Sequence, residues 1–333
     1  MTRAAVLTGI GSHLPPRAVS NDELAARLDT SDEWIRSRTG IGQRYVAAPG
    51  TATSDLAVCA GENALKSSGE SMVDAVVVAT TTPDRPCPAT APRVAWRLGL
   101  VGAAAYDISA VCTGFIYGLA TACGLIATGI ADRVLVIGAE TYSSILNPGD
   151  RSTSVIFGDG AAAVTLRAGE PAEPGAIGPF DLGSDGDGRD LITVRAGGSE
   201  QRLSGVDPAP GDHYFAMAGK EVFWQAVQHM AESARAVLEL AGLGLDDVDW
   251  LVGHQANARI LNRLAGELGI APERSISNIA EVGNTAAASI PLALAHAQAT
   301  GTLQAGDRIL LTACGGGITW GSALLTWPHM GLP

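Results

Sequence analysis

The chain has 333 residues, of which 47% are hydrophobic and 17% are charged. A chain of this length can bury a large core in one or two domains, and the composition is typical of packed helices and sheets, not of disorder. The formal net charge of −12 argues against nucleic acid as a partner, because surfaces that bind phosphate backbones are basic.

The N-terminal segment "MTRAAVLTGIGSHLPP" predicts a first strand and not a secretory signal peptide, because its apolar run is short and ends by Pro15. Phe115–Ala131 comes closest to a membrane span, but it lies mid-chain and contains glycines and threonines. The five cysteines lack CxxC spacing and are odd in number, so we expect neither a disulfide framework nor a zinc site. These features predict a cytoplasmic protein without a metal site or a membrane contact.

Strand-like and helix-like segments alternate along the chain. The β-branched runs Val73–Thr82 and Ala131–Glu140 are typical of strands that are buried on both faces. The patterns at Ala89–Leu98 and Gly114–Ile130 predict helices, and the second of these carries no charge. The alternation predicts an α/β fold.

The second half of the chain repeats features of the first. "VDAVVVAT" at Val73 resembles "VDWLVGHQ" at Val248, and "ADRVLVIGAE" at Ala131 resembles "GDRILLTACG" at Gly306. Both pairs lie 175 residues apart, which favours a duplicated βαβ core over a chance likeness between strands. We expect the boundary in the Gly/Pro/Glu-rich stretch 167–178, which gives halves of 1–170 and 171–333.

The repeat predicts which distant residues meet. If the two halves face each other across a pseudo-twofold axis, the counterpart of Cys112 lies near Gly283–Asn284, and that of Thr80 lies near Gln255. His254 and Asn284, from the second half, would then approach Cys112, from the first half.

Cys112 is a candidate nucleophile. It directly precedes the uncharged helix, where the positive end of the helix dipole would favour the thiolate. His254 follows the strand-like "DWLV", and Asn284 opens an Ala-rich helix predicted over Thr285–Ala299. A cysteine, a histidine and an asparagine at the ends of core elements can form a nucleophilic site.

Each of these residues also has a purely structural interpretation. Cys112 could be a small residue that fills space, His254 a satisfied core histidine and Asn284 a helix cap. The run Gly315–Gly317 could place backbone N–H groups around a substrate oxygen as an oxyanion hole, or it could be a tight turn.

The chain resembles β-ketoacyl-acyl-carrier-protein synthase III, a family of condensing enzymes with the thiolase fold. The resemblance spans nearly the whole length, and its motifs occur in the family's order: "TSDEWIRSRTGI" (30–41), "CTGF" (112–115), "FGDGAAAV" (157–164), "HQANARI" (254–260), "GNTAAASIPLAL" (283–294) and "GGGITWGSAL" (315–324). It implies a thiolase-like α/β fold with layers in the order α-β-α-β-α.

The resemblance also implies an activity. Cys112 would take an acyl group from acyl-CoA, and a malonyl group on acyl carrier protein would lose CO2 and attack the resulting thioester. His254 and Asn284 would donate hydrogen bonds as enolate charge develops, and the backbone N–H groups of Cys112 and Gly316 would hold the oxygen of the tetrahedral intermediate. No cofactor is implied, since neither a metal nor a nicotinamide takes part, and the family is usually homodimeric.

Substrate contacts follow from the same resemblance. The positions that match the family's contacts to CoA and its pantetheine arm are Trp34, Arg38, Arg151 and Asn257. The positions expected to dock the acidic carrier protein are Lys220, Arg259 and Arg263. The lysines that the family often carries one turn later are replaced here by Gly266 and Glu267.

Two departures fall at the expected acyl pocket. Cys87 and Cys314 stand where family members often carry phenylalanine, and Cys87 belongs to a loop that closes the pocket of the neighbouring subunit. Loss of two rings favours a primer that is longer or more branched than acetyl, unless neighbouring side chains fill the space. Thr113 also stands where alanine or serine is commoner, with no functional explanation from the sequence.

Two other functions remain open at this point. Some relatives transfer an acyl group to a hydroxyl or amine without forming a carbon–carbon bond, but these tend to lose the asparagine that is retained here as Asn284. Others are non-catalytic partner subunits, which commonly lose the cysteine that is retained here as Cys112. The sequence leaves the pathway, fatty-acid or polyketide, undecided.

Overall fold

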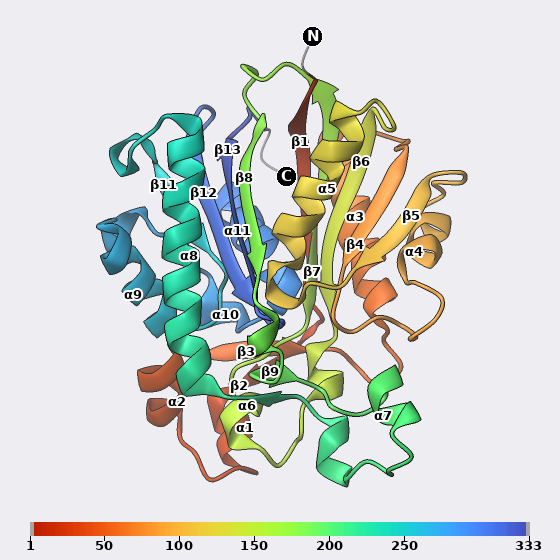
Figure 1. Ribbon diagram of the computed structural model, residues 1–333, viewed down its shortest axis with the longest axis vertical. Coiled ribbons are helices and arrows are strands. Elements are labelled where there is room, and N and C mark those ends of the chain that lie inside the picture. The colour runs from red at the N-terminus through yellow and green to blue at the C-terminus, as the bar shows by residue number, and fades with distance from the viewer. Residues whose placement is uncertain (1–2, 331–333) are drawn as a thin grey trace.

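Two sheets form the centre of the fold in the computed structural model, which describes residues 3–330 (Figure 1). The first sheet has the order β1-β7-β6-β4-β5, with strands β1 (Ala4–His13), β7 (Gly160–Gly169), β6 (Arg133–Glu140), β4 (Ala75–Ala79) and β5 (Ala104–Ile108). The second has the order β8-β13-β12-β11, with strands β8 (Ile177–Ser184), β13 (Thr319–Thr326), β12 (Arg308–Gly315) and β11 (Trp250–Gly253).

Some of the helices cover and separate these sheets, and others lie at one end of the molecule. The α-helices of residues 3–330 are α1 (Asn21–Ala25), α2 (Asp32–Thr39), α3 (Thr53–Ser68), α4 (Ala91–Arg97), α5 (Gly114–Ala127), α6 (Arg151–Ser154), α7 (Ser199–Leu203), α8 (Gly219–Ala241), α9 (Ala258–Leu268), α10 (Ile279–Val282) and α11 (Ser289–Ala299). Two small hairpin-like pairs, β2 (Arg17–Ser20) with β3 (Gln43–Val46) and β9 (Ile192–Thr193) with β10 (Ala216–Met217), lie with α1, α2, α6 and α7 at one end of the molecule (Figure 1).

The elements form five layers. Helices α3 and α4 cover the outer face of the first sheet, α5 and α11 lie between the sheets, and α8 and α9 cover the second sheet (Figure 1). Strand β4 shows why this arrangement suits its sequence: Val76 packs in the outer cluster with α3, whereas Val77 packs in the central cluster with α5. A β-branched run buried on both faces is what a strand between two helical layers requires. The predicted α-β-α-β-α layering is confirmed.

The duplication is visible in both topology and offset. Strands β6 and β12 begin at Arg133 and Arg308, and β4 and β11 begin at Ala75 and Trp250, so both pairs keep the offset of 175 residues. The same offset relates Val111 and Ala286, which have φ angles of 47° and 44°. The counterpart of Cys112 is therefore Ala287, three residues beyond the predicted Asn284. The division into residues 1–170 and 171–333 stays a prediction.

Two helix predictions were wrong in extent. The helix expected over Gly114–Ile130 ends at Ala127, and one side of it is solvent-exposed in the single chain, at Gly124 for example. The Ala-rich helix starts at Ser289 and not at Thr285, because Ala286 has a left-handed backbone conformation and begins a short 3₁₀ turn, Ala286–Ala288, that precedes the helix. Among the helices of residues 3–330, none has both the length and the apolar character to cross a bilayer.

Candidate active site

Cys112 lies in a 3₁₀ turn, Val111–Thr113, that leads directly into α5 between the two sheets. Val111 has a φ of 47°, a left-handed conformation that is strained for a β-branched residue. Such strain persists where the surrounding structure demands a sharp turn. Here the turn places a cysteine, 7% exposed, at the N-terminus of the central helix.

His254 follows β11 and is buried, with an exposed fraction of 3%. Its backbone N–H donates to the carbonyl of Thr312 on β12 at 2.8 Å, and its Nδ1 atom lies 2.6 Å from Oγ of Ser289. Burial lowers the pKa of His254 to about 3, because desolvation disfavours the charged imidazolium. The ring is therefore neutral near pH 7.

Asn284 is held from both sides of its backbone and through its side chain. Its N–H donates to the carbonyl of Ile156, and its own carbonyl accepts from Gly158, both at 2.9 Å. The side-chain Oδ1 accepts from the N–H of Ala286 at 2.8 Å, in the manner of a cap. The amide nitrogen has only a 3.4 Å contact, to the carbonyl of Ala256, so the Nδ2 hydrogens are the part of the carboxamide that can serve a ligand.

The three residues line one small cavity of about 60 Å³, here called the Cys112 cavity. Its other lining residues include Cys314, Tyr142, Phe157 and Phe215. The rings of Tyr142 and Phe157 stack at 4.4 Å, and Phe215 packs edge-on against both. A sulfur, an imidazole and a carboxamide thus share one small space with an aromatic wall.

The environment of the sulfur differs from the sequence-based expectation. Burial raises the pKa of the Cys112 thiol, and the nearby carboxylate of Glu140 raises it further. Desolvation disfavours the thiolate and so opposes the expected effect of the helix dipole. Glu140 itself is fully buried. Burial raises its pKa to about 7, although hydrogen bonds from Thr82 and Thr81 act in the opposite direction and lower it.

The glycine run meets the nucleophile turn. A Cβ atom on Gly315 would lie 2.8 Å from the backbone nitrogen of Cys112, so only glycine allows this approach. Gly316, the next residue, lines a second hollow of about 770 Å³, here called the Gly316 hollow. This hollow shares Tyr142, Ile192 and Phe215 with the Cys112 cavity.

A third hollow, of about 620 Å³, shares lining residues with the Cys112 cavity and is called here the arginine hollow. Its lining contains six of the residues singled out from the sequence: Trp34, Arg38, Arg151, Lys220, Asn257 and Arg259. Asn257 lines both this hollow and the Cys112 cavity, while its Oδ1 caps α9 through the N–H of Ile260. The arginine hollow therefore adjoins the Cys112 cavity.

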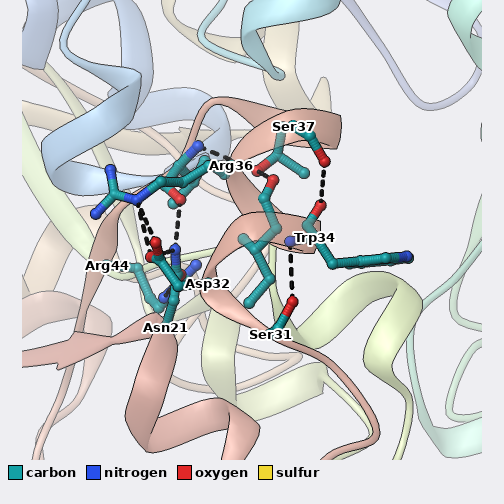
Figure 2. Close-up of polar contacts among 10 residues, drawn as sticks. Asn21, Ser31, Asp32, Trp34, Arg36, Ser37 and Arg44 are labelled. Carbon is teal, nitrogen blue, oxygen red and sulfur yellow. Dashed lines mark hydrogen bonds and ion pairs between the residues drawn. The ribbon is translucent and has the colours of Figure 1, made fainter.

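Trp34 presents a flat ring beside two cations. The guanidinium carbon of Arg38 lies 4.7 Å from the centre of the indole, and that of Arg151 lies 5.1 Å away. Figure 2 shows Ser31 capping α2 and the indole extending from the opposite side of the helix to Asp32 and Arg36. An aromatic face with two guanidinium groups is suited to a base and its phosphates.

Two of the predicted residues lie apart from these spaces. Arg263 packs outside the arginine hollow, with its guanidinium 6.0 Å from the ring of Trp224 and 3.6 Å from Glu267. Cys87 is exposed on the loop before α4 and lines none of the three spaces. Cys314, by contrast, is buried in the Cys112 cavity.

Several residues of the site escaped the sequence-based reasoning. Ser289 contacts His254, Glu140 lies near Cys112, and Tyr142 and Phe215 form the aromatic wall. No local pattern marks them, since each acts through a contact between segments that are far apart in the chain.

Comparison with known proteins identifies the family. The model described as 3-oxoacyl-[acyl-carrier-protein (ACP)] synthase III matches residues 106–186, and the model of its C-terminal part matches residues 238–327. β-Ketoacyl-[acyl-carrier-protein] synthase III 3 of Streptomyces coelicolor is 68% identical over 330 residues, which cover 98% of each chain. This chain belongs to the β-ketoacyl-acyl-carrier-protein synthase III family.

Other relatives agree with this assignment. The synthase III of Pseudomonas aeruginosa PAO1 is 55% identical over 330 residues, covering 99% of this chain and 98% of the relative. A crystal structure of synthase III from the same strain superposes with a TM-score of 0.93, at 53% identity over 98% of this chain and 99% of that one. The priming β-ketosynthase of the R1128 polyketide pathway gives 0.92 at 34% identity, over 100% and 98% of the two chains. The chain is thus an acyltransferase of the thiolase-fold condensing type, as the sequence predicted.

Proposed function

We propose that this synthase III starts fatty-acid or polyketide chains by joining an acyl group from acyl-CoA to malonyl-acyl carrier protein. The observation that carries the proposal is that Cys112, His254 and Asn284 line one small cavity, next to a hollow with an aromatic ring and several cations. The names of the relatives support the condensation reaction and give no support to acyl transfer to a hydroxyl or amine.

In the first half-reaction, Cys112 attacks the carbonyl carbon of acyl-CoA. A bond forms between Sγ and that carbon, the bond from the carbon to the CoA sulfur breaks, and the thiol proton ends on CoA, which leaves as a thiol. Because the resting thiol is neutral and buried, the proton departs as the substrate arrives, not beforehand. The backbone N–H groups of Cys112 and Gly316 are the proposed donors to the oxygen of the tetrahedral intermediate.

In the second half-reaction, malonyl-acyl carrier protein loses its carboxylate as CO2. The carbanion that remains attacks the acyl-cysteine carbonyl, the bond from this carbon to Sγ breaks, and the cysteine takes up one proton. Charge accumulates on the malonyl thioester oxygen, where neutral donors in a dry site are effective. His254 and Asn284 are the proposed donors. The reaction balances without a metal, a nicotinamide or any other cofactor.

The protonation of His254 suits this role. Ser289 Oγ lies within 3.4 Å of the N–H of Gln255, which points a donor at that oxygen. If Oγ accepts there, the serine hydroxyl proton points to Nδ1 of His254, and the ring carries its own proton on Nε2. A neutral Nε2–H is the form that can donate to a developing oxyanion.

The arginine hollow is the proposed CoA site. Trp34 would stack on the adenine, Arg38 and Arg151 would pair with phosphates, and Asn257 would contact the pantetheine arm as it passes towards Cys112. Lys220 and Arg259 border this hollow, and Arg263 lies beyond Trp224, so the three cations form a local patch for an acidic carrier protein. Such a patch is needed because the chain as a whole is acidic.

The proposed primer is longer or more branched than acetyl. Cys314 leaves room beside Cys112, and the Cys112 cavity adjoins the 770 Å³ Gly316 hollow through three shared residues. Turnover measured across acyl-CoA chain lengths should show a preference beyond acetyl, and Cys314→Phe should shift that preference towards acetyl. A sharp preference of the unchanged enzyme for acetyl-CoA would contradict this part of the proposal.

The proposed assembly is a homodimer in a reducing, cytoplasmic setting. Within residues 3–330, the first sheet ends at β5, whose far edge has no strand partner. An open edge can pair with a second copy. Cys87 lies exposed on a neighbouring loop, where it could reach the other copy's acyl pocket, and all five cysteines are free. Light scattering should give twice the chain mass; a monomer would contradict this assembly.

The chemical proposal is tested by incubating the protein with a series of acyl-CoA thioesters, followed by malonyl-acyl carrier protein. Intact-protein mass spectrometry should show one acyl group on Cys112. When malonyl-acyl carrier protein is added, this acyl group should be lost from the enzyme while CO2 and β-ketoacyl-acyl carrier protein form. An adduct that persists without CO2 release would contradict condensation, and the absence of any adduct would contradict the nucleophile assignment.

A further inference from the structure

Two threonine hydroxyls connect the nucleophile turn to the glycine run. Oγ1 of Thr113, the residue after Cys112, lies 2.7 Å from Oγ1 of Thr319, which is 206 positions later in the chain. Thr319 is the first residue of β13 and follows the run Gly315–Gly317 that ends β12. This contact therefore joins the first half of the chain to the second, next to the sulfur.

The hydroxyl protons can be assigned from the distances. Thr113 Oγ1 lies 2.6 Å from the carbonyl oxygen of Ala110, an acceptor that has no proton of its own. The single hydroxyl proton of Thr113 is therefore donated to Ala110, and its oxygen accepts from Thr319. The other acceptors near Thr319 Oγ1 are farther away, at 3.3 Å for Gly316 and 3.4 Å for Ala110. Two hydrogen bonds therefore follow one another: Thr319 donates to Thr113, and Thr113 donates to the backbone carbonyl of Ala110, two residues before Cys112.

The two hydrogen-bonded threonines lie in the segments that carry the proposed oxyanion donors, the backbone N–H groups of Cys112 and Gly316. Thr113 is fully buried and belongs to the same 3₁₀ turn as Cys112. Thr319 pairs in register with Gly315 and is separated from Gly316 by two residues. The contact of Gly315 with the Cys112 nitrogen leaves no space for a side chain, so the two backbones already meet. A displacement of either segment would change the separation of the two N–H groups.

We propose that Thr113 and Thr319 form a clasp that fixes the Cys112 turn against the Gly316 turn, and that this clasp sets the position of both oxyanion donors. The inference rests on the proposed function, since it assigns a positioning task for the same reaction. It also accounts for a threonine at position 113, which the sequence alone left unexplained. Neither threonine is a catalytic residue: both act through the backbone of their neighbours.

The test uses valine, which keeps the shape of threonine and removes the hydroxyl. Thr113→Val, Thr319→Val and the double variant are compared with Thr113→Ser, which retains the hydroxyl, and with Thr121→Val. Thr121 lies on α5 and donates only to the Tyr117 carbonyl of its own helix, so it is a matched control. The rate of Cys112 acylation in a single turnover, kcat, KM for acyl-CoA and the melting temperature are measured for each.

The clasp predicts a specific pattern. Each valine variant should lower the acylation rate and kcat by roughly 10-fold to 100-fold, the range expected when catalytic groups shift by up to about 1 Å, with KM within about threefold of the unchanged enzyme. The rates of the double variant should lie within about twofold of those of the slower single variant, because either substitution alone already breaks the Thr113–Thr319 bond. Thr113→Ser and Thr121→Val should remain near full activity.

Contrary results are equally specific. Folded valine variants with unchanged rates, additive losses in the double variant, or a rise in KM with unchanged kcat would overturn the clasp. If Thr113→Val does not fold, Thr319→Val decides alone, since Thr319 is only partly buried. The unchanged enzyme separates this test from that of the function: if it acylates and condenses while the variants match it, the clasp is wrong and the proposed function stands.

Discussion

The Nδ1 atom of His254 lies 2.6 Å from the Oγ atom of Ser289, so a residue at the first position of α11 controls the proton on the imidazole. In a buried site the tautomer is decided by such a partner, because no solvent is present to exchange it. The pair therefore links the fold, in which α11 lies between the sheets, to the chemistry at the cavity.

Replacement of Ser289 by alanine should remove the hydrogen bond that keeps the proton of His254 on Nε2. We expect CO2 release from malonyl-acyl carrier protein to slow by roughly 10-fold, less than the 10²-fold or greater loss for removal of a whole donor. Acylation of Cys112 should change little. Ser233→Ala is the control, because Ser233 on α8 is similarly buried but makes only a 3.4 Å bond, to the carbonyl of Asp181 on β8. Equal slowing of both half-reactions would contradict the assignment.

Acid should destabilise the protein through His254. Its pKa is lowered to about 3 in the folded state, whereas an unfolded histidine binds a proton below about pH 6.5. The unfolded state therefore holds more protons between these values, and stability is lost as the pH falls. Between pH 6.5 and 5 this one group contributes a loss of about 2 kcal/mol. Urea unfolding of His254→Gln should show a correspondingly smaller loss; equal losses would contradict a buried neutral ring.

Cys112 should react slowly with small alkylating agents in the free enzyme. Burial and Glu140 raise the thiol pKa above its ordinary value of 9.0, and only the thiolate reacts. The rate of alkylation by iodoacetamide should therefore keep rising beyond pH 9, without a plateau near neutrality. Peptide mapping separates Cys112 from the exposed Cys87. A plateau around pH 7 would indicate that the helix dipole dominates after all.

Trp34 should contribute to affinity for the nucleotide and not to the chemistry. Trp34→Ala should lower kcat/KM for acyl-CoA by roughly 10-fold, which corresponds to about 1–2 kcal/mol of stacking and cation–π contact. The same variant should leave an acyl-pantetheine substrate, which lacks the nucleotide, almost unaffected. Trp96→Ala is the control, because Trp96 is 73% exposed on α4. A similar loss with both substrates would contradict a nucleotide site in the arginine hollow.

Asn21 links Asp32, the first residue of α2, to the buried side chain of Arg44 (Figure 2). Asn21 donates to Asp32 and accepts from the buried guanidinium of Arg44, both at 2.8 Å. Asn21→Ala should lower the free energy of unfolding by about 2 kcal/mol, because it leaves a buried charged donor without this partner. Asn63→Ala removes one exposed bond and should have a much smaller effect in the same denaturant titration. Equal effects would contradict the role of this network.

The sequence predicted the architecture because its strongest patterns are local or periodic. Valine-rich runs identify strands between helical layers, and the 175-residue offset of β4 and β6 from β11 and β12 follows from similar strings. The same offset brought His254 and Asn284 towards Cys112, and all three line one cavity.

The remaining features depend on contacts that no pattern encodes. The Ala-rich run gives no sign of the left-handed turn at Ala286, so the start of α11 was placed four residues too early, at Thr285 and not at Ser289. The state of the Cys112 thiol depends on burial and on Glu140, which comes from another strand. Thr113 and Thr319 meet only once both halves have folded.

The most direct measurement is single-turnover decarboxylation by pre-acylated enzyme. The unchanged protein, His254→Ala and Asn284→Ala are each loaded with an acyl group from acyl-CoA, and CO2 release from malonyl-acyl carrier protein is followed. We expect all three to carry the acyl group on Cys112, and each variant to release CO2 at least about 10²-fold more slowly. If either variant releases CO2 at the unchanged rate, that residue does not act on the shared thioester, and the account of the Cys112 cavity is wrong.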